Sequence, residues 1–194
     1  MKNKIAHKFT TEQQDFIDKY VYGEIIFNEK TNSLDITGSV IIENTLEDLI
    51  IPMKLGIIRD NFIIDYKKIN SFENLPEWIG GTFEIKNCIF NGNDIKITTK
   101  YIGGNFLLHD NNNIGNLIEL PNYIGGEFYF GDIWKKLKSI PKYIGGDMVV
   151  ISNSDDLGNT LNPQKLMGIF RKININDLLF WFYKFVKNYY FKIN

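Results

Sequence analysis

Apolar and polar residues alternate in short stretches that recur along the middle of the chain. Each stretch has one apolar residue on each side of an intervening residue, as Phe83 and Ile85 flank Glu84. This alternation is typical of short strands with one buried face. From Val40 to Met148, the first apolar residue of each stretch steps by 22, 21, 23, 22 and 20 residues. The pattern predicts six short parallel strands, centred near residues 41, 63, 84, 107, 129 and 149.

A four-residue word, aromatic-Ile-Gly-Gly, precedes four of these strands. It occupies residues 78–81, 101–104, 123–126 and 143–146, and in three copies a Pro stands two residues before the aromatic. We expect the Pro to hold an extended return segment and the Gly pair to adopt positive φ at a corner of the coil. The word indicates a structural role, because it lacks the Gly-x-Gly-x-x-Gly pattern and the Lys of phosphate-binding loops.

The rest of each repeat completes a solenoid pattern. Leu-x-x-Leu-Pro or a close variant precedes the word, and Asn or Cys follows the strand, as at Cys88, Asn111 and Asn153. These features resemble the short bacterial form of the leucine-rich repeat family and the Pro-x-x-Ile-Gly-Gly repeats of bacterial and phage proteins. The resemblance covers about residues 34–162. It departs from the family at the Gly pair and at Tyr66, where the polar turn residue is missing.

The resemblance implies a leucine-rich-repeat-like solenoid with a parallel β-sheet of about six short strands and few or no convex helices. One coil buries too little surface alone, so coils share a core and the ends need caps. We expect an N-terminal helical cap at 1–33, the solenoid at 34–162 and a C-terminal helical cap at 163–194. Thr11 and Gln14 have capping-box spacing for a helix near 11–22, and Pro163 marks the start of two C-terminal helical segments.

Charge is distributed unevenly along the chain, although the formal net charge is only -1 over 194 residues. Residues 163–194 carry a net +5, and the preceding 162 residues carry -6. An acidic body argues against nucleic-acid binding, which depends on neutralising phosphates. No apolar run approaches the roughly 20 residues of a membrane-spanning helix. A cytoplasmic location is therefore expected, which would be the host cytoplasm for a viral protein.

Few side chains offer catalytic or metal-binding chemistry. The single Cys88 excludes an intramolecular disulfide, and two histidines, His7 and His109, leave little for a His-based metal site or triad. Cys88 occupies a turn position where the resembled family accepts Asn or Cys. We therefore expect a non-enzymatic protein with no catalytic residues, no cofactor and no metal.

The positions between the inward strand residues are unexpectedly apolar, and polar residues flank them on both sides. Such a stripe marks an interaction surface or a face covered by another element. We predict a protein-binding module that acts through its concave sheet face. The resemblance to phage and bacterial repeats suggests an inhibitor or effector of a host protein. The predicted partner-binding residues are Ile41, Ile63, Glu84, Lys86, Leu107, His109, Glu127, Tyr129 and Val149.

Two alternatives remain open at this point. The stripe can be covered by the chain's own terminal helices or by a second copy of the chain. The aromatic, basic segment from Leu178 to Lys192 can instead serve a self-associating structural or membrane-peripheral protein, with an oligomer interface or a membrane surface as its partner.

Overall fold

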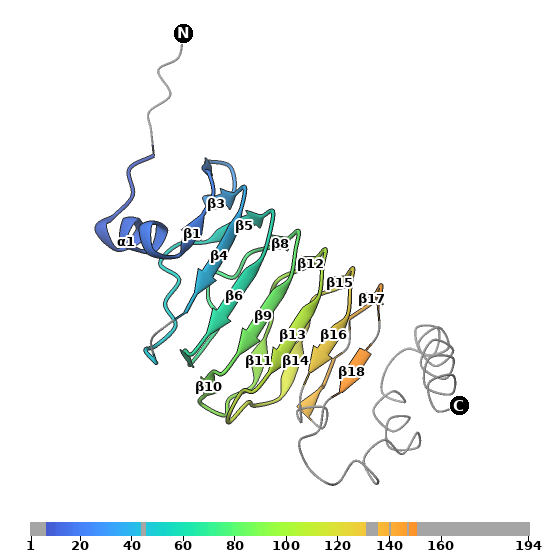
Figure 1. Ribbon diagram of the computed structural model, residues 1–194. Helices are drawn as coiled ribbons and strands as arrows, with labels where there is room; N and C mark the ends of the chain where they lie inside the picture. Colours follow the sequence, from blue (N-terminus) through green and yellow to red (C-terminus); the bar gives the residue numbers. More distant parts are fainter. Residues whose placement is uncertain (1–6, 44–45, 131–135, 140, 147, 151–194) are drawn as a thin grey trace, which may run out of the picture.

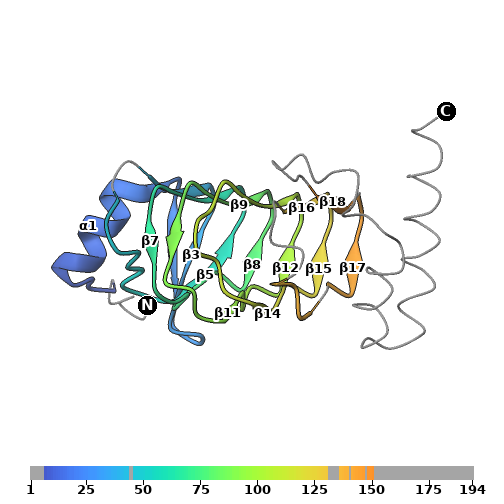
Figure 2. The same ribbon diagram turned by 90° about the horizontal axis from the view of Figure 1, so that it is seen from below.

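The computed structural model describes residues 7–43, 46–130, 136–139, 141–146 and 148–150. Within these residues the chain winds into a β-solenoid, whose coils stack along one axis from the N-terminal end (Figure 1). One α-helix, α1 (Thr11–Tyr20), lies at that end, and short strands make up the other elements. Two long sheets line different sides of the solenoid, as the second view shows (Figure 2).

Sheet A contains all six strands that the sequence predicted. Its seven strands run in the order β1-β4-β6-β9-β13-β16-β18, and every neighbouring pair is parallel except β1 with β4. Phe62, Phe83, Phe106 and Phe128 pair in register, so equivalent positions of successive coils are neighbours. The bounds are β1 Val21–Tyr22, β4 Ser39–Ile42, β6 Phe62–Asp65, β9 Phe83–Lys86, β13 Phe106–His109, β16 Phe128–Phe130 and β18 Met148–Val150.

Sheet B is a second seven-stranded sheet, which the sequence pattern did not predict. It runs in the order β17-β15-β12-β8-β5-β3-β2 and is parallel except where β2 meets β3. The aromatic-Ile pair of each word forms its strand, and the Ile points into the core. The bounds are β2 Ile25–Asn28, β3 Ser33–Ile36, β5 Leu55–Ile58, β8 Trp78–Ile79, β12 Tyr101–Ile102, β15 Tyr123–Ile124 and β17 Tyr143–Ile144.

The remaining side of the coils carries two short parallel sheets of two strands each. One joins β7 (Lys68–Ile69) to β10 (Ile89–Phe90), and the other joins β11 (Ile95–Lys96) to β14 (Leu117–Glu119). In the described residues this return side holds no α-helix.

The Gly pairs form the corner between sheet B and sheet A, but for a different reason from the one expected. Among the described glycines only Gly23 and Gly92 have positive φ, so the predicted positive φ at the Gly pairs was wrong. Close approach of successive coils explains them instead. A Cβ added at Gly103 would lie 2.2 Å from the backbone oxygen of Gly80. The Gly103 N–H donates to the Ile79 carbonyl at 2.8 Å, which holds the coils at this spacing.

The polar residues that follow strands β9 and β13 of sheet A adopt left-handed backbone conformations in the turn at the end of each strand. Asn87 and Asp110 each have φ of 53°, a conformation that Asn and Asp adopt more readily than most residues. Asn111, which directly follows Asp110, both accepts and donates a hydrogen bond to the preceding coil. Its Oδ1 accepts from the Cys88 N–H at 2.9 Å, and its Nδ2 donates to the Ile85 carbonyl at 2.9 Å.

The core is a set of parallel columns that run along the solenoid axis. On the sheet A side, four fully buried Phe rings lie with successive centroids 5.1, 5.2 and 5.3 Å apart. Because each ring contacts its counterparts in neighbouring coils, stability depends on the stack rather than on any one coil. The fully buried Ile column of sheet B consists of Ile58, Ile79, Ile102, Ile124 and Ile144.

Helix α1 begins at the predicted residue but differs in its cap and its end. The N-cap is Thr10, whose side chain and backbone bond Gln13 reciprocally in a capping box, one residue before the predicted Thr11–Gln14 pair. The helix ends at Tyr20 because β1 follows at once. Phe16 and Ile17 are buried in the core. The predicted C-terminal cap at 163–194 lies outside the described residues.

Candidate functional site

The predicted partner-binding residues lie in adjacent rows on the outer face of sheet A. Lys86 and His109 are paired in register in one row, and Glu127 precedes β16 on the side of the Gly corner. Eight of these residues are partly buried, and Glu127 is exposed. The central row joins six positions that pair in register, namely Ile41, Ile63, Glu84, Leu107, Tyr129 and Val149.

An ionic cluster interrupts this central row at Glu84. Glu84 Oε2 accepts from Lys86 Nζ at 3.1 Å, and Glu84 Oε1 lies 3.2 Å from His109 Nε2. The hydrogen bond that Lys86 donates to Glu84 raises the pKa of Lys86, which keeps the ammonium protonated. The His109 ring lies edge-on to Tyr129, with ring centroids 5.4 Å apart, and its Nδ1 lies 2.8 Å from Asp110 Oδ2. The stripe is therefore two apolar patches on either side of a charged centre.

The outer face of sheet A is open within the described part of the chain. Figure 1 shows no described element in front of β6, β9, β13 and β16. Helix α1 packs at the end of the solenoid against β1 and β4. Within the described residues, the central row is therefore accessible to a ligand.

A second side-chain array lies on the outer face of sheet B. We call it the aromatic ladder: Trp78, Tyr101, Tyr123 and Tyr143 stack with centroids 5.3, 4.5 and 4.6 Å apart and interplanar angles of 3°, 6° and 10°. Partial burial and the neighbouring Tyr101 and Tyr143 raise the pKa of Tyr123. Sequence reasoning missed this array because it assigned the whole repeated word to structure. The aromatic position at the start of each word was the available signal.

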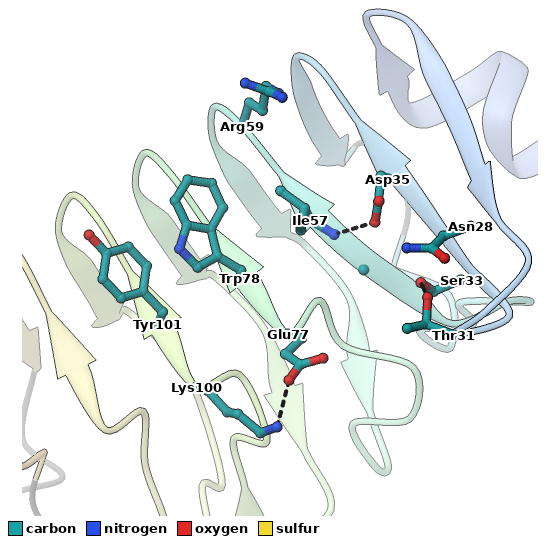
Figure 3. A pocket seen from close by; sticks show the side chains of 11 residues that line it. Asn28, Thr31, Ser33, Asp35, Ile57, Arg59, Glu77, Trp78, Lys100 and Tyr101 are labelled. Carbon is teal, nitrogen blue, oxygen red and sulfur yellow. Dashed lines mark hydrogen bonds and ion pairs between the residues drawn. The ribbon is translucent and has the colours of Figure 1, made fainter.

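A groove of about 480 Å³ opens where the aromatic ladder ends at Trp78 (Figure 3). The next position in register is Ile57, whose side chain is smaller and which is 43% exposed. On the far side, the Asp35 carboxylate accepts from the Ile57 N–H at 2.9 Å. At the near edge Glu77 and Lys100 form an ion pair at 2.5 Å, and the hydrogen bond from Lys100 lowers the pKa of Glu77.

Cys88 is fully buried and lies in neither array. Burial raises the pKa of its thiol to about 11, and the thiol donates to the Lys86 carbonyl at 3.1 Å. A thiol held protonated at neutral pH is a weak nucleophile. In the described ranges, no group of three or more His, Cys, Asp or Glu side chains is placed to hold a metal ion. None of the helices in those ranges has the length and apolar character needed to cross a membrane.

Comparison with protein-family models, with curated proteins and with solved structures found no match to this chain. The geometry of the two outer faces is therefore the basis for assigning a function.

Proposed function

We propose that this chain is a non-enzymatic protein-binding module that docks its partner on the outer face of sheet A. The observation that carries the proposal is the central row, in which six side chains from consecutive coils align in register on an open, rigid sheet. Exposed apolar patches with a polar rim are typical of interaction surfaces. In this proposal the repeats are leucine-rich-repeat-like, α1 and the C-terminal segment are caps, and the protein acts in the cytoplasm.

The row also indicates the shape of a suitable partner. Neighbouring strands lie about 4.8 Å apart, so the row from Ile41 to Val149 extends roughly 24 Å along the solenoid axis. An α-helix of about 16 residues has this length. An amphipathic helix of a partner, apolar at both ends and charged at its centre, would match the two apolar patches and the Glu84 cluster.

Leu107 and Tyr129 are the expected anchors, because central aromatic and aliphatic side chains carry much of the energy of such interfaces. A compact, rigid module of this kind also suits an inhibitor or effector of a host protein, which is the role implied by the resemblance to phage and bacterial repeats.

The test starts from the full chain on a solid support, with proteins retained from bacterial lysate identified and then purified for titration. The double variant Leu107→Ser with Tyr129→Ser should fold as the wild type. Its affinity for each specific partner should fall by roughly 30-fold, equivalent to about 2 kcal/mol. Lys96→Ser, an exposed change on the return side, is the matched control and should leave affinity unchanged.

Three other results would count against the proposal. Stable, monomeric double variants that retain every partner at wild-type affinity would exclude this face as the docking site. A large drop in melting temperature would show instead that another part of the chain covers the row, because burying such a side chain contributes roughly 1.5–3 kcal/mol. Conversion of a wild-type oligomer to monomers would assign the row to a second copy of the chain.

A further inference from the structure

We propose that the groove at the Trp78 end of the aromatic ladder binds a sugar ring of a neutral oligosaccharide, which stacks on the indole. This site lies on sheet B, so it is independent of the protein-docking face on sheet A. Three features of the groove indicate this ligand: a free aromatic face, a polar wall fixed in position, and a balanced charge.

The free aromatic face follows from the way the ladder ends. Tyr101 and Tyr123 have a ring neighbour on each side, so both of their faces are covered. Trp78 stacks on Tyr101 but has Ile57, not a ring, as its neighbour in register on the other side, and its side chain lines the groove there (Figure 3). An aromatic face is electron-rich and attracts the weakly positive C–H groups that cover one side of a pyranose ring.

The polar wall is held in place by the backbone of the neighbouring strand. A Cβ at Gly56 would lie 2.1 Å from Asp35 Oδ1 and 2.7 Å from Ser33 Oγ, so Gly56 allows both side chains to lie against β5. Asp35 Oδ1 accepts from the Ile57 N–H, and Ser33 Oγ lies 2.7 Å from Thr31 Oγ1. The second oxygen of Asp35 therefore remains an acceptor in a fixed orientation at the groove. Such preorganised polar groups determine specificity in sites of this size.

The charges around the groove balance. Glu77 and Lys100 neutralise each other in their ion pair. Asp35 and Arg59 are the other two charged lining residues, and the Arg59 side chain forms no ion pair within the described residues. A site with one acceptor carboxylate and one donor guanidinium suits a ligand whose hydroxyl groups both donate and accept.

This chemistry favours a neutral sugar over other flat ligands. A nucleotide would bring phosphate charge to a site with no net positive charge. A purely aromatic ring would stack on Trp78 but would offer no hydrogen bond to the second carboxylate oxygen of Asp35 or to the Arg59 guanidinium, and covering such a group without a partner costs about 1–3 kcal/mol. Sugar hydroxyl groups replace the lost water at these atoms, while the apolar face of the ring covers the indole.

The experiment titrates the full chain by calorimetry with defined neutral hexasaccharides: α-linked and β-linked glucans, a mannan fragment and chitohexaose. Heparin fragments and ATP serve as anionic comparisons. The proposal expects at least one neutral oligosaccharide to bind with 1:1 stoichiometry and neither anionic probe to compete for the site. Binding of an anionic probe in the groove, or no binding by any neutral probe at millimolar concentration, would overturn it.

Three variants then locate the site. Trp78→Ala should lower the affinity for the oligosaccharide by at least about tenfold. Ile57→Tyr should extend the ladder by one ring, fill the groove and abolish binding without loss of stability, which keeps the test decisive if Trp78→Ala unfolds. Arg59→Ala, which removes no ion pair, should weaken binding severalfold. Tyr143→Ala at the other end of the ladder is the matched control and should bind as the wild type. Retained affinity in both Trp78→Ala and Ile57→Tyr would place the sugar elsewhere and refute the assignment.

Discussion

The substitution Gly103→Ala tests directly whether close coil approach explains the Gly pairs. The added methyl group would lie 2.2 Å from the Gly80 carbonyl oxygen, more than 1 Å inside the 3.4 Å at which ordinary van der Waals contact begins. The obstacle is backbone of the neighbouring coil, so it cannot rotate away as a side chain could. The corner must open, and the two hydrogen bonds from the N–H groups of Gly103 and Gly104, each 2.8 Å, must lengthen.

The magnitude follows from these two effects. Each weakened backbone hydrogen bond contributes a net ~1 kcal/mol, and inserting a methyl group into close packing adds about 1–3 kcal/mol of strain. We therefore expect Gly103→Ala to lower the free energy of unfolding by about 3–5 kcal/mol. For a chain of this size that corresponds to a fall of roughly 6–20 °C in melting temperature.

Thermal and urea unfolding followed by far-ultraviolet circular dichroism measure this loss. Gly92→Ala is the matched control, because Gly92 has φ of 83° but its added Cβ would meet only the Asn113 side chain, at 3.3 Å. There the left-handed backbone alone should lower stability, by about 1–2 kcal/mol. If Gly103→Ala is as stable as the wild type, or loses less than Gly92→Ala, the close-approach explanation is wrong.

Two further substitutions or treatments test the turns and the core. Tyr66→Asn should raise the free energy of unfolding by about 0.5–1 kcal/mol, because Tyr66 has φ of 54° where the equivalent coils use Asn87 and Asp110. An unchanged or lower urea midpoint would contradict this. Cys88 should resist Ellman's reagent in the native protein at pH 8 and react once urea unfolds the chain, because burial raises its pKa to about 11 and the thiolate is scarce until pH approaches that value. Rapid native-state labelling would contradict the burial.

The strands of sheet A could be predicted because their signal is local and repeated. Four-residue strands such as Phe83–Lys86 show apolar alternation, and the period of about 22 residues places them in neighbouring coils. Sheet B was missed because strands such as Tyr101–Ile102 have only two residues, too few for alternation to appear. These strands exist only because the stacked coils bring the same dipeptide into register.

The candidate sites show the same limit. The central row of sheet A could be predicted by position, since outward residues follow from strand alternation. The bond between Glu84 and His109 joins residues 25 apart in sequence, and it depends on the register of the stacked coils. The groove beside Trp78 likewise needs residues of three successive sheet B strands, with Asp35 and Ile57 from the other two. No local pattern in any one repeat indicates it.

Both proposed sites lie where the repeat departs from its own regularity. The central row is apolar except at Glu84, and the outer column of sheet B is aromatic until Ile57. A solenoid gains stability from near-identical coils that stack on one another. An aromatic residue at position 57 would add a stacking contact of about 0.5–1.5 kcal/mol. Well-packed apolar residues often replace largely buried ion pairs, such as that of Glu84 with Lys86, without loss of stability. Folding alone therefore gives little reason for either residue, whereas each of the two proposed sites requires one of them.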